Sequence, residues 1–219
     1  TISAYETYKL LRKKNPQRYY GLPEHAEIQI SSVATSRDQA QMLFREVQRH
    51  YSSCDFFGKY QSKSTQTYAA FQSPYDKRET GDPDDGGEES IQVTFYSSVS
   101  KGIRGTNNIV VIMDEAAFFP SSGEKSAKAV YDAAAPSTAA FSKKDSDDPT
   151  KRVGPVEGKI IMISSPFTKE GLFYEKYAQS KSGYKAADDL LMIQAPTWEV
   201  NPTIPHEYFQ SKFHEDPEI

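Results

Sequence analysis

The 219-residue chain is poor in cysteine, with Cys54 alone, and it has no long apolar run. A single cysteine cannot form an internal disulfide, which indicates a reducing, intracellular setting. No segment approaches the ~18 consecutive apolar residues of a membrane-spanning helix, so a spanning protein is excluded. No basic segment followed by an apolar one opens the chain, so no signal peptide is expected.

Two motifs that would mark a ligand site are also missing. The four histidines show no H-x-x-H spacing and there is no C-x-x-C pair, so a zinc site is not expected. No G-x-x-x-x-G-K-[ST] occurs either. That motif forms the glycine-rich loop whose amides and lysine hold nucleotide phosphates. The segment G-E-K-S at 123–126 contains similar residues at the wrong spacing.

An excess of positive charge is lacking as well, since 26 basic residues face 30 acidic ones and the net charge is -4. This balance does not indicate a protein coated in positive charge for nucleic acid. The distribution is uneven, however: residues 1–70 carry 10 basic and 6 acidic side chains, whereas residues 71–150 carry 8 and 14. A basic face is therefore expected, if anywhere, in the first third. The overall composition is globular, and the length fits one large domain.

The chain does contain apolar runs separated by helical patterns. The runs IVVIM (109–113) and IIMI (160–163) are apolar throughout, as in strands buried on both faces. Apolar residues at helical spacing from Ala40 to Tyr51 predict a helix, with Ser36 and Gln39 as a capping box. We therefore expect an α/β fold with a mostly parallel sheet flanked by helices. Strands are expected over 27–35, 91–96, 109–113, 159–164 and 190–195, helices over 2–14, 36–51, 124–134 and 169–182, and polar loops over 76–89 and 142–158.

Two acids, Asp114 and Glu115, directly follow the IVVIM run. In α/β sheets, ligands bind at the carboxyl ends of the strands. An apolar strand that ends in two acids suits nucleotide hydrolysis. Asp114 would hold Mg²⁺ and Glu115 would polarise a water as general base. Acids are also common where a strand reaches the surface, so the pair alone leaves both interpretations open.

Small hydroxyl residues follow the second apolar run, as Ser164, Ser165 and Pro166. Hydroxyls at a strand end can sense a γ-phosphate or a bound water and pass that state to a neighbouring element. Ser-Pro is also ordinary turn chemistry. By itself this signal does not choose between the two.

Two further positions suggest contacts with phosphate. Thr35, Ser36 and Arg37 follow the first expected strand. A helix cap accounts for Ser36, but a helix N-terminus also attracts phosphate, which leaves a nucleic-acid backbone contact at Arg37 open. Arg104 lies between two glycines ahead of the acidic strand, so we expect an exposed guanidinium that is either solvated or in contact with phosphate or DNA.

The order of these motifs resembles the ATPase core of the phage terminase large subunit. TISAYETYKLL (1–11) and NPQRYYGL (15–22) are similar to the helix and connector ahead of that family's second motif. The resemblance covers nearly the whole chain outside the two polar loops. The other matching segments are A-T-S with Q-A (34–36, 39–40), R-G (104–105), IVVIMDEAAFF (109–119), IIMISSPFTKEGLFYEKY (160–177) and PTWEVNPTIP (196–205).

The resemblance implies a RecA-like P-loop NTPase core of the ASCE type, with ATP and Mg²⁺ as cofactors. It implies that Asp114 is the Walker B carboxylate on the magnesium side and that Glu115 is the catalytic base. Arg104 matches an R-G feature to which no role can be assigned. The remaining matches are to the motif that couples hydrolysis to DNA movement (Ser164, Ser165, Pro166) and to a motif near the nucleotide (Thr35, Ser36, Gln39).

The same family carries two parts that this sequence does not show. Its phosphate-binding loop lies upstream of a helix like the one expected over 2–14, and a nuclease domain follows its ATPase domain. We therefore expect 1–219 to be a partial ATPase domain, with 196–219 beginning the linker toward a nuclease domain. Alone, it is expected to bind ATP weakly and not to turn it over.

For the full protein the resemblance implies ATP-driven packaging of double-stranded DNA into viral procapsids. The implied partners are double-stranded DNA, a portal protein and a small terminase subunit, with a homo-oligomeric ring in the host cytoplasm during virion assembly. Two alternatives remain. A helicase-type translocase would normally carry S-A-T where this chain has S-S-P. A non-catalytic α/β binding module would explain the missing phosphate-binding loop.

Overall fold

A computed structural model describes residues 2–79, 88–97, 102–182, 189–201, 203–205, 207, 208 and 210. The chain divides into two compact units, residues 1–175 and residues 176–219. The larger unit holds the sheet and most of the helices; the smaller one contains the short helix α8 (Thr197–Val200). Within the described residues no helix is long and apolar enough to cross a membrane.

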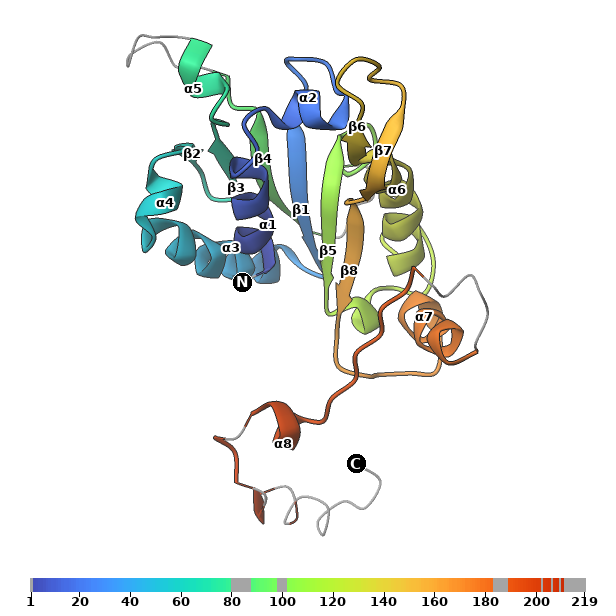
Figure 1. The fold of residues 1–219 in the computed structure, drawn as a ribbon. Coiled ribbons are helices and arrows are strands. Elements are labelled where there is room, and N and C mark those ends of the chain that lie inside the picture. Colours follow the sequence, from blue (N-terminus) through green and yellow to red (C-terminus); the bar gives the residue numbers. More distant parts are fainter. Residues whose placement is uncertain are drawn as a thin grey trace. The chain divides into compact units, whose positions relative to one another are not determined.

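The larger unit is built on a six-stranded sheet in the order β2-β3-β4-β1-β5-β8 (Figure 1). The strands β4, β1, β5 and β8 are parallel to one another, and β3 and β2 add to the β4 side as antiparallel strands. The mostly parallel α/β sheet predicted from the sequence is therefore confirmed. The strands span Ile28–Ala34 (β1), Gln61–Ser64 (β2), Tyr68–Phe71 (β3), Ile91–Ser97 (β4), Asn108–Asp114 (β5) and Lys159–Ile163 (β8).

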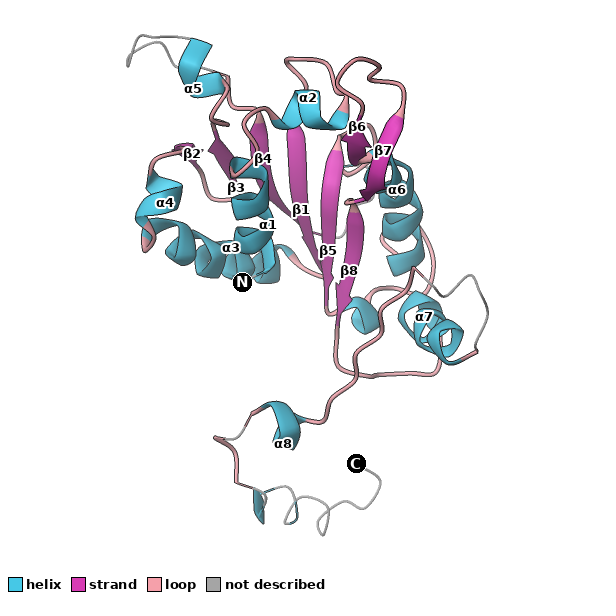
Figure 2. Ribbon diagram, in the orientation of Figure 1, coloured by secondary structure: helices cyan, strands magenta, loops and turns pink. Residues whose placement is uncertain are grey.

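Helices cover both faces of this sheet (Figure 2). α1 and α3 pack against β1 and β4, whereas α6 packs against β5 and β8. Ser36 caps α3 by accepting the backbone N–H of Gln39, as the capping pattern predicts. The helices span Ile2–Leu11 (α1), Pro16–Tyr20 (α2), Arg37–Ser52 (α3), Asp55–Gly58 (α4), Asp76–Glu79 (α5), Ala127–Ala140 (α6) and Gly171–Lys181 (α7), with a 3-10 turn η2 at Ala116–Phe118.

Neighbouring residues of the central strands fill two separate cores. Val110 of β5 packs in a cluster with Phe44 of α3, and the next residue, Val111, packs in another with Val130 of α6. All four side chains are buried, and each contributes on the order of 1.5–3 kcal/mol to folding. Because both faces of the sheet are covered, the strand is apolar at successive positions, and this is the pattern that the IVVIM run displays.

Three predictions of local structure are wrong. Residues 190–195 form no strand, since no described strand pairs with them and an isolated strand leaves its backbone groups unsatisfied. The second polar loop contains a hairpin of β6 (Ser142–Lys144) and β7 (Arg152–Val156), whose mostly exposed residues give no apolar signal. The first polar loop begins with α5, while residues 80–87 lie outside the described part.

The β6–β7 hairpin packs directly on the turn that ends α2. Gly21 ends that helix in the left-handed conformation, with φ 67°. A Cβ atom on Gly21 would lie 2.8 Å from Lys144 Cγ and 2.9 Å from the carbonyl oxygen of Pro149, so a side chain does not fit. The hairpin and α2 are therefore in close contact at the amino ends of β1 and β5, the edge opposite to Asp114.

Candidate active site at the carboxyl edge of the sheet

Three neighbouring parallel strands, β1, β5 and β8, end at the same edge of the sheet. Val33 of β1 pairs with Met113 of β5, and Asp114 of β5 pairs with Ile163 of β8. The residues that follow these strands therefore lie beside one another, in the place where α/β sheets bind ligands. Segments that are far apart in the chain meet here only because the strands are neighbours.

Asp114 is half-buried at the end of β5 and is held from the β1 side. The Gln39 side-chain amide donates to Asp114 Oδ2 at 3.1 Å, and the Thr35 hydroxyl donates to Gln39 Oε1 at 2.7 Å. Burial raises the pKa of Asp114 and the neighbouring Glu115 charge raises it further, while the Gln39 hydrogen bond opposes both effects. A cation placed here would favour the ionised form that burial and Glu115 disfavour.

Glu115 adopts a left-handed backbone conformation, with φ 54° and ψ 45°, and it is the one non-glycine residue with positive φ in the described chain. This conformation costs on the order of 1–2 kcal/mol and is concentrated at functional sites. The Ser164 hydroxyl donates to Glu115 Oε2 at 3.3 Å and accepts the Ala117 N–H at 3.1 Å. A side chain at the end of β8 therefore contacts both Glu115 and the turn that follows it.

The other predicted residues of the coupling motif and of the phosphate contacts differ in position. Ser165 and Pro166 follow Ser164 and are exposed. Arg37 is exposed at the start of α3, on the same edge, where it lines a hollow of about 250 Å³. Arg104 is exposed in the turn before β5. The length of that strand, roughly 20 Å at ~3.3 Å per residue, separates the turn from Asp114, so the structure does not bring Arg104 to this edge.

A hollow of about 300 Å³ beside these residues was not foreseen from the sequence. It lies beyond the ends of β5 and β8, and the segment after each strand supplies part of its lining, including Ala117 and Phe167. The rings of Phe118 and Phe167 stack with centroids 4.7 Å apart, which joins the two segments. The sequence signal that could have indicated this contact is an aromatic residue shortly after each motif, Phe118 after D-E and Phe167 after S-S-P.

The oxygen donors at this edge fit magnesium better than zinc. The described residues include no group of three or more His, Cys, Asp or Glu side chains that could hold a metal ion. Magnesium does not need such a group, because it is usually bound through one or two carboxylates together with waters and substrate phosphates. Asp114 would be the carboxylate ligand, and Glu115 lies beside it without having to coordinate.

The strand β8, which carries Ser164 at its end, is the outer strand of the described sheet. Its residues are half-buried, and Ile163 is 43% exposed, whereas β5 is buried along nearly its whole length. An apolar parallel strand at the edge of a sheet presents a row of backbone groups to which another strand can add.

Comparisons with known proteins agree with this architecture. Residues 1–219 match the family described as the N-terminal P-loop domain of the uncharacterized protein MJ0330. No curated protein matches the sequence. Among solved structures, a mutant ATPase domain of the large terminase from Thermus phage P74-26 has a TM-score of 0.58 at 18% identity, over 88% of this chain and 73% of that one.

The large terminase of bacteriophage HK97 is similar in the same way, with a TM-score of 0.52 at 15% identity. The alignment covers 94% of this chain but 42% of that one, so this sequence spans less than half of the HK97 protein. The TM-scores show a shared fold, and at identities this low the likeness shows the fold alone. The fold expected from the motif order is therefore confirmed as that of the terminase ATPase domains.

Proposed function

The chain belongs to the family described as the N-terminal P-loop domain of the uncharacterized protein MJ0330, and from that premise we propose that its carboxyl edge hydrolyses ATP with Mg²⁺. One observation carries the proposal: Asp114 and Glu115 lie at the end of a buried central strand, where Gln39 of the helix after β1 contacts Asp114 and Ser164 after β8 contacts Glu115. This arrangement supports the roles of Walker B carboxylate for Asp114 and catalytic base for Glu115.

Each contacting residue has a definable task in that reaction. Magnesium, when bound, neutralises charge on the phosphates. Asp114 would hold the ion, and Gln39, fixed in turn by Thr35, orients the carboxylate. Glu115 would accept a proton from the attacking water. Ser164 keeps the Glu115 carboxylate in place and would report its state to Ser165, Pro166 and the segment after β8.

On this proposal a segment outside these 219 residues supplies the phosphate-binding loop, because no G-x-x-x-x-G-K-[ST] occurs in them. The position of β8 at the edge of the described sheet supports this, since a strand added there would end next to Ser164. A loop following that strand could reach phosphates bound at Asp114. We therefore expect the 219 residues alone to bind ATP weakly and not to turn it over.

The wider role that fits this fold is that of a terminase-type motor that packages double-stranded DNA. The shared fold with two phage large terminases supports this role. On this proposal the partners are double-stranded DNA, a portal protein, a small terminase subunit and further copies of the same chain in a ring. The place of action would be the host cytoplasm during virion assembly.

The test is Mg²⁺-dependent ATP turnover by the complete natural protein that carries this sequence. Glu115→Gln should lower turnover by about 10²- to 10⁴-fold, the usual contribution of a general base, while ATP binding persists. The matched control is Glu46→Gln on the outer side of α3, where Glu46 pairs with Arg49 in an exposed ion pair. This control should keep the wild-type rate.

Two results would overturn the proposal. Equal turnover in the wild type and Glu115→Gln would remove Glu115 from the chemistry. No Mg²⁺-dependent turnover in the folded, ATP-bound complete protein would instead favour a non-catalytic binding module. Turnover by the 219 residues alone, lost in Glu115→Gln, would leave the site standing and contradict the expectation that another segment supplies the phosphate-binding loop.

A further inference from the structure

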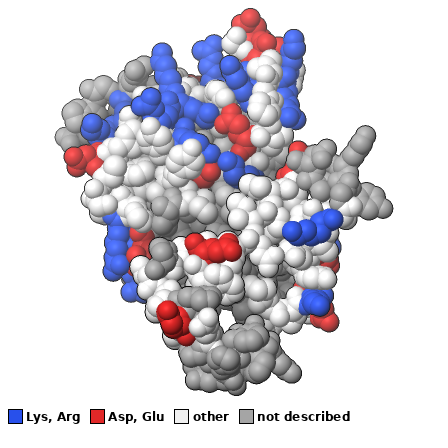
Figure 3. Space-filling model, turned by 60° about the horizontal axis from the view of Figure 1, so that its bottom comes forward, with Lys and Arg blue, Asp and Glu red and all other residues white. Residues whose placement is uncertain are grey.

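A basic groove of about 600 Å³ lies at the edge of the sheet opposite to Asp114, between α2 and the β6–β7 hairpin. Five of the basic residues of the first third of the chain fall between positions 7 and 23, where there is no acid. Figure 3, a view turned by 60° from that of Figure 1, shows many lysine and arginine side chains in its upper part, with some acidic side chains among them. Six cations line the groove: Arg12, Lys13, Lys14, Arg18, Lys143 and Lys144.

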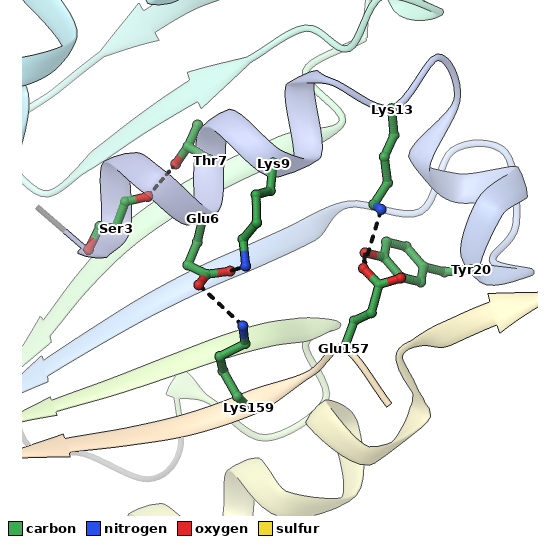
Figure 4. Close-up of polar contacts among 8 residues, drawn as sticks. All are labelled: Ser3, Glu6, Thr7, Lys9, Lys13, Tyr20, Glu157 and Lys159. Atoms are coloured by element: carbon green, nitrogen blue, oxygen red, sulfur yellow. Dashed lines mark hydrogen bonds and ion pairs between the residues drawn. The ribbon is translucent and has the colours of Figure 1, made fainter. Parts of the chain in front are cut away.

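Five of these cations have no counterion among the residues that the structure describes. Within the same part of the chain, only Lys13 of the six forms an ion pair, with Glu157 at 3.2 Å (Figure 4). Nearby Lys9 and Lys159 do not add to the groove, because both pair with Glu6. Uncompensated cations that are held close together favour a ligand with several negative charges.

The tyrosines of the groove do not add negative charge. Tyr19 donates a hydrogen bond to Glu157 at 2.6 Å, and this bond, with partial burial, raises the pKa of Tyr19 to about 12. The ammonium of Lys13 lies 3.8 Å from the centre of the Tyr19 ring. Tyr75, which also lines the groove, donates to Glu24 at 2.5 Å. Lysines and arginines beside aromatic rings are typical of surfaces that follow a nucleic-acid backbone.

The aspartates of the hairpin turn lie outside the groove and are bonded within the turn. Asp145 accepts the backbone N–H groups of Asp147 and Asp148, and Asp148 accepts both the N–H and the hydroxyl of Thr150. These bonds lie within the turn, and none of the three aspartates lines the groove. The carboxylates therefore shape the hairpin that presents Lys143 and Lys144.

From this arrangement we propose that the basic groove binds the phosphodiester backbone of a nucleic acid. Cations lie on two walls, from α2 and the turn that precedes it on one side and from β6 on the other, so phosphates running between them would be contacted from both. The close packing of Gly21 against the hairpin keeps the walls together. Such contacts position a nucleic acid without reading its sequence, as a protein that moves along DNA requires.

This inference rests on the proposed function in one respect, since a motor that moves along DNA has to bind the DNA backbone. It makes its own prediction, because the groove and the acids of the carboxyl edge lie at opposite ends of the central strands. Binding of a nucleic acid here needs neither ATP nor Mg²⁺. The groove can therefore be tested while the hydrolytic site stays intact.

The experiment measures the affinity of the complete natural protein for a duplex and for a single-stranded DNA of mixed sequence, without nucleotide, over a range of salt concentrations. The groove variant combines Arg12→Gln, Lys14→Gln, Arg18→Gln and Lys143→Gln, four cations that are exposed. The control combines Arg45→Gln, Arg49→Gln, Lys59→Gln and Lys63→Gln, which removes the same charge from exposed sites on α3, the end of α4 and β2.

The groove variant should bind DNA at least tenfold more weakly than the wild type, and the control should be affected much less. The slope of log K against the logarithm of the salt concentration should become less steep in the groove variant. The change should be about 0.9 for each duplex phosphate that the variant no longer neutralises, and about 0.7 for each phosphate of a single strand. Comparison of the two DNAs therefore identifies which form the groove holds. Basal ATP turnover without DNA should be the same in both variants.

Equal DNA affinity and salt slope in the groove variant and the control would overturn the inference, whatever the ATP turnover shows. If the groove variant failed to fold, Lys14→Gln and Lys143→Gln would be measured singly, and an unchanged salt slope in both would count equally against it. Loss of turnover in Glu115→Gln with unchanged DNA binding would support the proposed function. Undiminished turnover in Glu115→Gln would argue against that function and leave the inference about the groove unaffected.

Discussion

At the scale of single residues, the candidate site depends on two polar side chains that hold two acids. The sequence predicts Asp114 and Glu115 because two acids directly follow an apolar run, at the strand end where α/β sheets bind ligands. It does not predict that Gln39 bonds to Asp114 or that Ser164 bonds to Glu115, because those contacts depend on which strands are neighbours. Nor does it predict the left-handed φ of Glu115, which nothing in a D-E-A-A segment demands.

Replacement of Gln39 by alanine tests whether this residue orients Asp114. The variant removes both the donor to Asp114 and the acceptor of the Thr35 hydroxyl bond. The apparent affinity for Mg²⁺ in ATP turnover should fall about 10- to 100-fold, as for other partners of metal ligands, with little change in the rate at saturating Mg²⁺. Gln48→Ala on the same helix, whose amide bonds to Ser52, is the control. Identical Mg²⁺ titrations for both variants would contradict the assigned role.

At the scale of elements, the link from β7 to β8 determines where Ser164 lies, because β8 begins directly after it. Gly158 in this link lies against the end of α6: a Cβ on it would lie 1.9 Å from the Thr138 carbonyl oxygen and 2.7 Å from its carbon. These are backbone atoms, which cannot rotate aside. The close approach therefore requires glycine at this position.

Gly158→Ala should lower the free energy of unfolding by about 1–3 kcal/mol, the usual cost of forcing an extra carbon into a packed site. Urea unfolding followed by circular dichroism measures the change. Gly58→Ala is the matched control, because a Cβ there would meet nothing within 4 Å, and it should be nearly neutral. A Gly158→Ala protein as stable as the control would show that α6 and the link are not in this close contact.

The same link carries Glu157, which joins α2 and the turn that precedes it to the start of β8. Burial raises the pKa of Glu157, but hydrogen bonds from Tyr19 and Tyr20 and the charge of Lys13 outweigh it, so the pKa lies below its usual value. A carboxylate with a lowered pKa stabilises the fold above its unfolded pKa of ~4.3, and that contribution disappears as the pH falls through the folded pKa.

Glu157→Gln should therefore cost about 1 kcal/mol of unfolding free energy at pH 7. The difference from the wild type should shrink as the pH is lowered below ~4.3 and vanish once the wild-type carboxyl is protonated. Unfolding curves collected from pH 7 to the acid limit measure this. Glu46→Gln, in an exposed pair, should differ little from the wild type at any pH. A constant difference for Glu157→Gln across this range would contradict the charge-based explanation.

At the scale of the whole molecule, the sequence predicts the parts that have a one-dimensional signal. The buried strand β5 and the half-buried strand β8 appear as the apolar runs at 109–113 and 160–163, and the capped helix α3 appears as helical spacing after Ser36. The polar hairpin β6–β7 and the antiparallel β2 and β3 give little such signal, because these strands are short and many of their residues are exposed or small.

The basic groove is likewise predicted only in part from the sequence. The sequence identifies a basic first third, but one wall of the groove consists of Lys143 and Lys144, which reach it only through the unforeseen hairpin. The apolar run at 190–195 is the opposite case: the local pattern is that of a strand, but no described strand pairs with it. In each case the missing information is which segments become neighbours in space.

A crystal structure of the complete natural protein with Mg²⁺ and a non-hydrolysable ATP analogue tests the central claim most directly. The account predicts the metal about 2.0–2.1 Å from an Asp114 carboxylate oxygen, or from a water bonded to it, with Glu115 facing the γ-phosphate. A nucleotide and metal bound elsewhere, out of hydrogen-bonding range of both Asp114 and Glu115, would contradict it.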